Sequence, residues 1–234
     1  MTSYFDHFIV TKIITSYLTD SFVIMVCVIV LWMVVSRYQF VIPSRFQSTM
    51  EVIIEHWATV VRENLGEETD YYVLPLCALF MFILGINLLG FFTYTFPPTT
   101  HVTLTFGMAF GVWIGVIFFG FYRFRSSFFS MFMPVGAPLG MSPLLVPIEI
   151  ASNVSRPIAL GMRLAANLTA GHILLAILAD FGCKLLFYSF SMANLFPMFI
   201  IMFMTGLEVG VLVIQAYVFC LLSMIYLKDS LVLH

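Results

Sequence analysis

Long stretches without any charged residue constrain this chain more than any other feature of its sequence. The longest extends from Tyr71 to Thr100, and another extends from Val102 to Tyr122. Inside a lipid bilayer no water pairs with exposed backbone groups, so apolar segments of this length have to be helical. The sequence therefore predicts an all-α integral membrane protein, with residues 1–234 forming a single membrane domain.

Composition disfavours several other classes of protein. Charged residues make up 9% of the chain and apolar types 62%, whereas about a quarter of the residues in a soluble domain are charged. So few charges cannot cover a water-facing surface, which disfavours a soluble enzyme, a disordered regulator and a basic nucleic-acid binder. The cysteines stand singly within apolar runs, which is typical of buried hydrophobic side chains rather than of metal ligands or disulfides: Cys27, Cys77, Cys183 and Cys220.

Five membrane spans are expected from the apolar pattern. The first three are residues 21–36, 71–96 and 102–122. The last two are longer, at 148–182 and 197–227, and as helices they would measure about 52 Å and 46 Å. Because a hydrocarbon core is only about 30 Å thick, these two spans should form a helical hairpin that is strongly inclined in the membrane.

Residues 44–65, between the first two spans, have the pattern of an amphipathic surface helix. Apolar side chains such as Trp57 recur at helical spacing, and acidic side chains lie elsewhere around the helix. Ser44–Gln47 fits a capping box, and Gly66 is a suitable end for the helix. Two interpretations stay open: a helix on the membrane surface, beside a protein neighbour or anionic lipid, or a solvated surface helix.

Residues 126–147 are also uncharged, but four prolines interrupt them. Proline removes a backbone donor and breaks regular helices, so this segment is expected to be an irregular loop against the membrane. The prolines are Pro134, Pro138, Pro143 and Pro147.

The basic residues predict the orientation of the chain. With five spans, six basic residues fall on one side and two on the other, which places the C-terminus inside and the N-terminus outside by the positive-inside rule. The six are Arg37, Arg45, Arg62, Arg123, Arg125 and Lys228, and the two are Lys12 and Lys184.

Charged residues within the last two spans are the strongest functional signal. A charge at mid-membrane costs roughly 2.5 to 3.5 kcal/mol on insertion scales, so such residues require a reason. Glu149, Arg156 and Arg163 follow one another at intervals of seven residues and therefore share one face of the first long helix. Asn167 continues this polar stripe one turn further.

Glu208 and Gln215 form a matching polar stripe on the second long helix. If the turn of the antiparallel hairpin is centred near residue 189, three pairs of polar residues should lie at equal depth. These pairs are Arg163 with Gln215, His172 with Glu208, and Glu149 with Asp229.

This layout has the chemistry of a proton path in two halves. Carboxylates and imidazole exchange protons near neutral pH after modest shifts, whereas an arginine stays protonated. Arg163 would therefore interrupt a continuous proton path and would favour the ionised form of any carboxylate beside it. The arrangement makes sense if a partner carries a proton past Arg163 on its own carboxylate.

Structural interpretations stay open for several of these residues. Arg156 could form a purely structural ion pair with Glu149, and Asn153 is also a possible structural residue. His172 could be a satisfied core histidine, and Glu208 could have a structural role. Three residues near helix ends are more simply interpreted as interfacial caps: Asp180, Lys184 and Asp229.

The segment from Ser155 to His172 reads SRPIALGMRLAANLTAGH, and it closely resembles the signature segment of subunit a of F-type ATP synthases. Similar segments occur in the order of that family over most of the chain from residue 43 onward. They are Pro43–Gln47, Asn87–Gly90, Pro147–Glu149, Glu208 and Gln215–Phe219.

The resemblance implies that Arg163 is the stator arginine, which faces the carboxylates of a rotating ring of c subunits. Asn167 and Gln215 would support it. The combination of histidine at 172 with an acid at 208 resembles the mitochondrial members of the family.

The resemblance also implies two offset half-channels for protons. His172 and Glu208 would line the outer half-channel, and Glu149 and Asp229 the inner one. Proton flow between them would turn the c ring and drive ATP synthesis in the mitochondrial inner membrane.

The expected partners are the c ring, the peripheral-stalk and other membrane-sector subunits, and the lipid bilayer. The chain has no Gly-rich loop ending in Lys-Ser/Thr, so ATP chemistry is expected in other subunits, and no cofactor or metal is expected here. Two other functional classes stay open. One is a stand-alone ion transporter or a proton-pumping subunit of a respiratory complex, and the other is a structural membrane scaffold.

Overall fold

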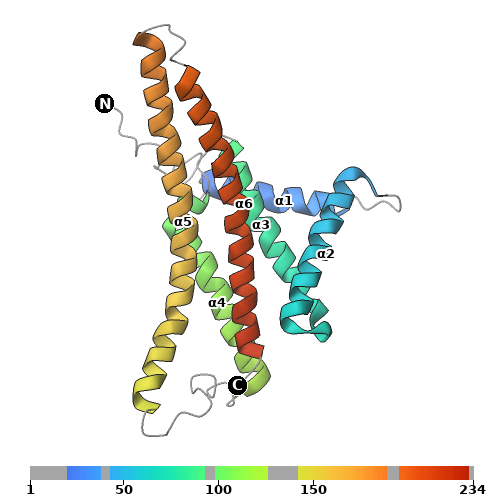
Figure 1. Cartoon of the computed structure of the whole chain (residues 1–234). Coiled ribbons are helices and arrows are strands. Elements are labelled where there is room, and N and C mark those ends of the chain that lie inside the picture. The colour runs from blue at the N-terminus through green and yellow to red at the C-terminus, as the bar shows by residue number, and fades with distance from the viewer. Residues whose placement is uncertain (1–19, 38–42, 93–97, 126–141, 189–194, 232–234) are drawn as a thin grey trace. The chain divides into compact units, whose positions relative to one another are not determined.

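The computed structural model describes residues 20–37, 43–92, 98–125, 142–188 and 195–231. All regular secondary structure in these ranges is helical, which confirms the all-α prediction (Figure 1). The α-helices are α1 (Asp20–Arg37), α2 (Arg45–Leu65), α3 (Val73–Phe92), α4 (Val102–Phe124), α5 (Ser142–Tyr188) and α6 (Leu195–Leu231), with short 3-10 helices η2 (Glu67–Tyr72) and η3 (Pro98–Thr100).

Four of these helices are long and apolar enough to cross a membrane, namely α3, α4, α5 and α6. The apolar part of α1, Ser21–Val35, is shorter than these four. The apolar segments of α5 and α6 contain 41 and 35 residues. At 1.5 Å per residue they measure about 62 Å and 52 Å, about twice the thickness of a hydrocarbon core. Their inclination in the membrane stays a prediction.

Helix α5 begins earlier than the sequence pattern indicated. Residues 142–147 were expected to belong to an irregular loop, but they form the first turns of α5. Pro143 occupies the second position of the helix, where the missing N–H would have no partner in any case. The rest of the expected loop, residues 126–141, lies outside the described residues. The expected first span, by contrast, agrees with α1 to within one residue at each end.

Helix α2 begins and ends as its sequence indicated. The Ser44 hydroxyl accepts a hydrogen bond from the Gln47 backbone N–H at 3.3 Å. Gly66 follows the helix at φ +97°, a conformation that side-chain-bearing residues rarely adopt. Arg62 then donates two hydrogen bonds to Asp70, at 2.8 and 3.0 Å, and so fastens the turn into η2.

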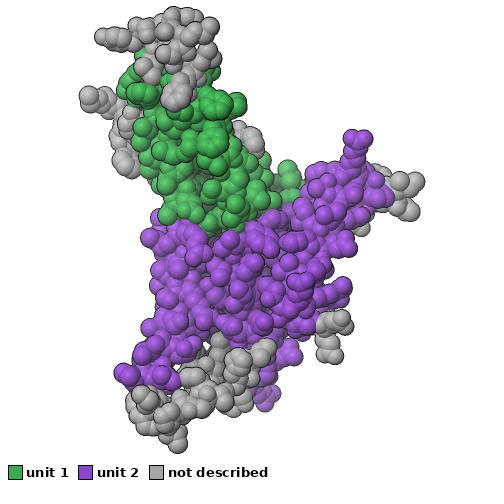
Figure 2. Space-filling view, viewed as in Figure 1, with its two compact units in different colours: residues 1–36, 82–101, 164–216 green, residues 37–81, 102–163, 217–234 purple. Residues whose placement is uncertain are grey.

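Two compact units divide the described chain, and Figure 2 colours each of them. Unit 1 contains α1, the second half of α3, η3, the part of α5 from Leu164 and the part of α6 up to Ala216. Its core includes Ile24, Val28 and Ile86. Helices α3, α5 and α6 each contribute to both units.

Unit 2 contains α2, η2, the first half of α3, α4, and the remaining parts of α5 and α6. Trp57 of α2 is 1% exposed. Its ring lies 5.4 Å from the ring of Phe80 on α3 and 5.4 Å from the ring of Tyr217 on α6. Part of the apolar side of this helix is therefore packed against protein within this unit, while Phe46 and Ile54 stay 54% and 47% exposed.

Candidate functional site

The polar residues expected to carry function lie on two helices. Helix α5 holds those from Glu149 to His172, and α6 holds those from Glu208 to Asp229. Both helices are otherwise strongly apolar, and a polar side chain in such a helix is costly. Each of these residues is therefore expected to have a bonding partner or a functional role.

Arg163 lies on an exposed part of α5, beside the exposed side chains of Met162 and Ala166. Within the part of the chain that the structure describes, it makes no ion pair and no side-chain hydrogen bond. Its charge lies in electrostatic range of the Tyr226 hydroxyl on α6. Since a guanidinium stays protonated, Arg163 presents a fixed positive charge that a group on another molecule can approach.

Asn167, one turn after Arg163 on α5, joins the two helices within unit 1. Its side-chain Nδ2 donates a hydrogen bond to Oε1 of Gln215 at 3.0 Å. Gln215 is only 5% exposed, and its own Nε2 has no hydrogen-bond partner among the described residues. The two side-chain amides are thus joined by one hydrogen bond, and the Nε2 donor of Gln215 is buried without a hydrogen-bond partner among the described residues.

Glu208 is a buried carboxyl group in unit 1. It is 8% exposed, and neither carboxyl oxygen accepts a hydrogen bond from a described residue. The carboxyl group lies against Gly171 of α5, where a Cβ atom would come within 2.6 Å of Oε1. Glycine at 171 therefore gives the space in which this carboxyl group rests.

His172 is half-buried and follows Gly171 on α5. Its Nε2 is buried without a hydrogen-bond partner in the described ranges, and its ring centroid lies 6.2 Å from that of Phe91 on α3. No hydrogen bond between His172 and Glu208 is present among the described side chains. Unit 1 therefore contains an imidazole nitrogen and a carboxylate that are both buried and both free to bond to something else.

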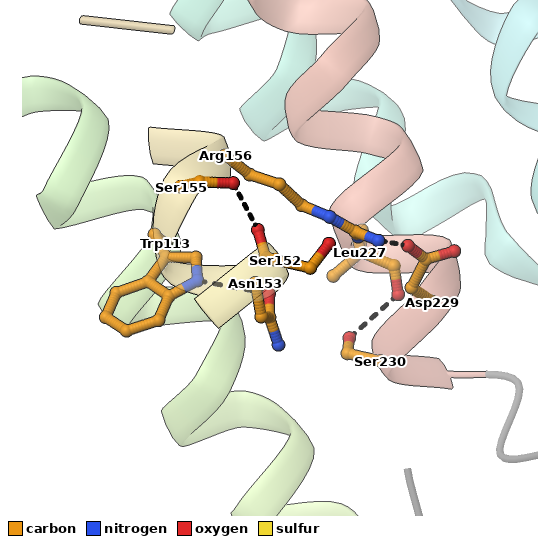
Figure 3. Close-up of polar contacts among 8 residues, drawn as sticks. All are labelled: Trp113, Ser152, Asn153, Ser155, Arg156, Leu227, Asp229 and Ser230. Carbon is orange, nitrogen blue, oxygen red and sulfur yellow. Dashed lines mark hydrogen bonds and ion pairs between the residues drawn. The ribbon is translucent and has the colours of Figure 1, made fainter. Parts of the chain in front are cut away.

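Arg156 and Asp229 form an ion pair between α5 and α6 within unit 2 (Figure 3). Nη1 of Arg156 donates to Oδ2 of Asp229 at 2.6 Å, and the two side chains are 31% and 38% exposed. The guanidinium carbon of Arg156 also lies 5.7 Å from the ring centroid of Tyr226. The alternative ion pair of Arg156 with Glu149 is wrong, because Asp229 occupies the guanidinium.

Glu149 is half-buried at the beginning of α5 and has no ion pair or side-chain hydrogen bond among the described residues. Asn153, one turn later, accepts a hydrogen bond from the indole Nε1 of Trp113 on α4 at 3.4 Å. Figure 3 shows Trp113 directed at Asn153 on one side of α5 and Arg156 extending from α5 to Asp229. Asn153 therefore helps to hold α5 against α4.

Of the three α5–α6 pairs expected at equal depth, two differ in the structure, whereas Glu208 lies against Gly171, the residue next to His172, as expected. Gln215 bonds to Asn167 rather than lying level with Arg163, and Asp229 pairs with Arg156 rather than lying level with Glu149. The reason is the position of the connection, which was expected to centre near residue 189. Helix α5 continues to Tyr188 and α6 begins at Leu195, so the midpoint between the ends of the two helices falls after residue 189.

Two neighbours of the site were not found from the sequence. Tyr226 precedes Asp229 by three residues, and this one-turn spacing was a usable signal for a contact on the same helix face. Trp113 gave no such signal, because it lies on α4, 40 residues before Asn153. Only the packing of two helices brings that pair together.

Metal chemistry receives no support from the side chains of this site. No group of three or more His, Cys, Asp or Glu side chains in the described residues could hold a metal ion. Two of the four cysteines, Cys77 and Cys220, are buried, and all four have free thiols. What the site offers is a fixed cation together with carboxyl, imidazole and amide groups, the groups that bind and pass on protons.

Comparison with known proteins gives extensive matches. The family model described as the ATP synthase A chain matches residues 18–228. The ATP synthase subunit a of Metridium senile is 44% identical over 232 residues, covering 99% of each chain. The protein of the same name from Rhodospirillum rubrum is 40% identical over 193 residues, 82% of this chain and 78% of that one. The one from Chondrus crispus is 37% identical over 215 residues, 91% and 85% of the two chains.

Proposed function

Because the chain belongs to the ATP synthase A chain family, we propose that it is the stator subunit that passes protons through the membrane sector of an ATP synthase. The observation that carries this proposal is Arg163, a fixed cation that is exposed and unpaired among the described residues of an apolar helix. A structural arginine at such a place would have an acidic partner, since an unpaired charge in a membrane is costly.

Protons enter from the outer side through the half-channel that contains His172 and Glu208. Both side chains have buried polar atoms without hydrogen-bond partners among the described residues, so each is available to accept and donate a proton. The last acceptor is a carboxylate on the ring of c subunits, which becomes neutral and can then enter the lipid.

Arg163 separates the outer half-channel from the inner one. It cannot pass a proton on, and its charge favours the ionised form of a ring carboxylate that arrives beside it. Asn167 lies one turn after Arg163 on α5 and donates a hydrogen bond to Gln215 on α6. This bond supports the part of α5 that follows Arg163. A proton therefore crosses only on the ring, after almost a full rotation.

The inner half-channel contains Glu149 and Asp229, and the proton leaves through it. Each 100 mV of membrane potential contributes about 2.3 kcal/mol for every proton that completes this path, which is the energy that turns the ring. ATP itself is made in other subunits, because this chain has no phosphate-binding loop.

The proposed location is the mitochondrial inner membrane, with the N-terminus on the outer side and the C-terminus in the matrix. The proposed partners are the c ring on the side of Arg163, and peripheral-stalk and other membrane-sector subunits elsewhere. Trp57 of α2 packs against Phe80 and Tyr217. The acidic side of the same helix is the proposed contact surface for these neighbouring subunits.

Substitution of Arg163 by alanine tests the proposal. In the assembled ATP synthase in liposomes, Arg163→Ala should abolish ATP-driven proton pumping, because the ring carboxylate is no longer held ionised between the two half-channels. Arg45→Ala, at an exposed arginine that begins α2, is the matched control and should pump normally. If Arg163→Ala still couples ATP hydrolysis to pumping, the mechanism is wrong. Proton flux through the purified chain alone would instead favour a stand-alone transporter.

A further inference from the structure

Asp229 differs from the other acidic residues of the proposed path in having a strong partner. Its carboxylate accepts a charge-assisted hydrogen bond from Arg156 at 2.6 Å, whereas Glu149 and Glu208 have no hydrogen-bond partner among the described residues. The pair joins positions 73 residues apart in the sequence. The ring of Tyr226 lies beside the same guanidinium and gives it a second contact.

We propose that Asp229 is a positioning residue, which holds Arg156 away from Glu149, and that Glu149 alone carries the proton to the inner side. This inference rests on the proposed function and gives the two acidic residues of the inner half-channel different roles. Asp229 lines that half-channel without taking the proton.

The geometry of α5 gives the physical reason. Glu149 lies seven residues before Arg156, and residues at that spacing share one face of a helix. Long side chains on a helix lean toward its N-terminus, so an unrestrained Arg156 leans toward Glu149. Without Asp229, the nearest acid on that face of α5 would be Glu149, and a new ion pair would occupy the proton-carrying group.

Proton transfer through Asp229 itself would be difficult in this arrangement. Each proton would have to displace the Arg156 guanidinium from Oδ2 and leave it with only the Tyr226 ring as a contact. The ion pair would then break and re-form for every proton that passed. Glu149 has no such partner among the described residues, so it can accept and release a proton without breaking a contact.

The test compares single and double neutral substitutions in the assembled ATP synthase in liposomes, measured as ATP-driven proton pumping. Asp229→Asn should lower pumping by about tenfold or more, because Arg156 is released toward Glu149. The double variant Arg156→Gln with Asp229→Asn should recover to within about threefold of the unmodified complex, because no guanidinium remains to occupy Glu149. A purely structural ion pair would instead show itself as a loss of assembled complex in Asp229→Asn, because removing one partner leaves an unpaired charge. Pumping is therefore measured per assembled complex, and Asp229→Asn should assemble but pump slowly.

Charge exchange gives a second measurement. Arg156→Asp combined with Asp229→Arg keeps an ion pair between α5 and α6, but places no carboxylate at position 229. This variant should assemble and pump well above either single exchange. If the double neutral and the exchanged variants both assemble but do not pump, Asp229 carries the proton and the inference is overturned. Failure of the exchanged pair to assemble also counts against it, since the pair is then not interchangeable.

Two further variants separate this inference from the proposed function. Glu149→Gln should stop pumping in both the unmodified and the double neutral background. If Glu149→Gln pumps normally, the inner half of the proposed function fails. If it does not pump and the double neutral variant does not pump either, only the role given to Asp229 fails. Lys184→Gln, which removes a one-turn ion pair with Asp180 elsewhere on α5, is the matched control and should leave pumping unchanged.

Discussion

Single buried polar atoms define what this site can do. Glu208 and His172 have polar atoms enclosed by the protein but bonded to none of the described groups, and an unbonded buried polar atom costs about 1 to 3 kcal/mol. Other buried groups, including Asn87 Nδ2 and Gln215 Nε2, also lack a partner among the described residues, but Glu208 and His172 are the ones at the positions proposed for proton uptake. Arg163 is the complementary case, a cation whose side chain stays exposed and unpaired in the described structure.

Gly171 provides a test at this scale, because its missing side chain makes room for the Glu208 carboxyl group. A methyl group at 171 would lie 2.6 Å from Oε1, and the end of a flexible side chain can move aside. Gly171→Ala should therefore assemble normally but slow ATP-driven proton pumping on the order of tenfold, since a shift of about 1 Å suffices to disturb proton transfer. The measurement is pumping per assembled complex.

The control for this substitution is Gly107→Ala on α4, where an added Cβ meets no atom within 4 Å. It should have no effect on pumping. Normal pumping by Gly171→Ala would contradict the role given to the Glu208 position.

At the scale of a single helix, the ends of α2 were predictable from its sequence, but its surroundings were not. Its two ends were predictable, because Ser44 caps the first turn and Gly66 adopts the positive φ that ends the helix. Its surroundings were not: the sequence left open whether the helix lay on lipid, on protein or in solvent. Trp57 and Val61 are almost fully buried in unit 2, so this part of α2 packs against other helices of the chain, whereas Phe46 and Ile54 stay 54% and 47% exposed.

Trp57 should accordingly stabilise the attachment of α2. Trp57→Ala removes a ring 5.4 Å from both Phe80 and Tyr217, and deletion of a buried aromatic side chain typically costs about 3 to 5 kcal/mol. We expect the subunit to be lost from the detergent-solubilised complex at a lower temperature than the unmodified subunit. Val52→Ala, at a side chain that is 61% exposed on the same helix, is the control and should not change that temperature. Equal heat resistance of the two variants would show that Trp57 does not anchor the helix.

At the scale of the whole molecule, the proposed function depends on protons reaching the path from one side and leaving from the other. The carboxylates proposed for these two steps, Glu208 and Glu149, belong to different compact units of the chain. Each unit contains parts of both α5 and α6, so the two long helices connect the residues of proton uptake to those of proton release.

Glu208→Gln tests this division. The substitution keeps the shape of the side chain but removes its exchangeable carboxyl proton, so proton uptake should slow by about tenfold or more while assembly is retained. The measurement is the rate of ATP synthesis in liposomes when the proton concentration on the outer side is limiting. Unchanged synthesis at low outer proton concentration would rule out Glu208 as an uptake group.

Local sequence patterns predicted much of this structure, including the helical class and the extent of α1, α2 and α4. Such features depend on neighbours along the chain, on apolar length and on capping residues. The start of α5 was not predicted, because prolines indicate an irregular loop, whereas Pro143 stands in the first turn of α5, where proline is tolerated, and Pro147 lies inside the helix. Contacts between helices were predicted less well: an ion pair of Arg156 with Glu149 on its own helix was one open interpretation, whereas Arg156 pairs with Asp229 on α6.

The sequence by itself determined that the chain is an all-α membrane protein and that the charges proposed to carry function lie on the last two long helices. A charge in an apolar segment is recognisable without knowing what lies beside it, because charged residues are rare and costly in membrane-spanning segments. Only the tertiary structure decided which polar groups bond to each other. These contacts join positions 48 and 73 residues apart, so no local pattern predicts them: Asn167 bonds to Gln215 and Arg156 to Asp229, while Arg163 and Glu208 stay unbonded among the described residues.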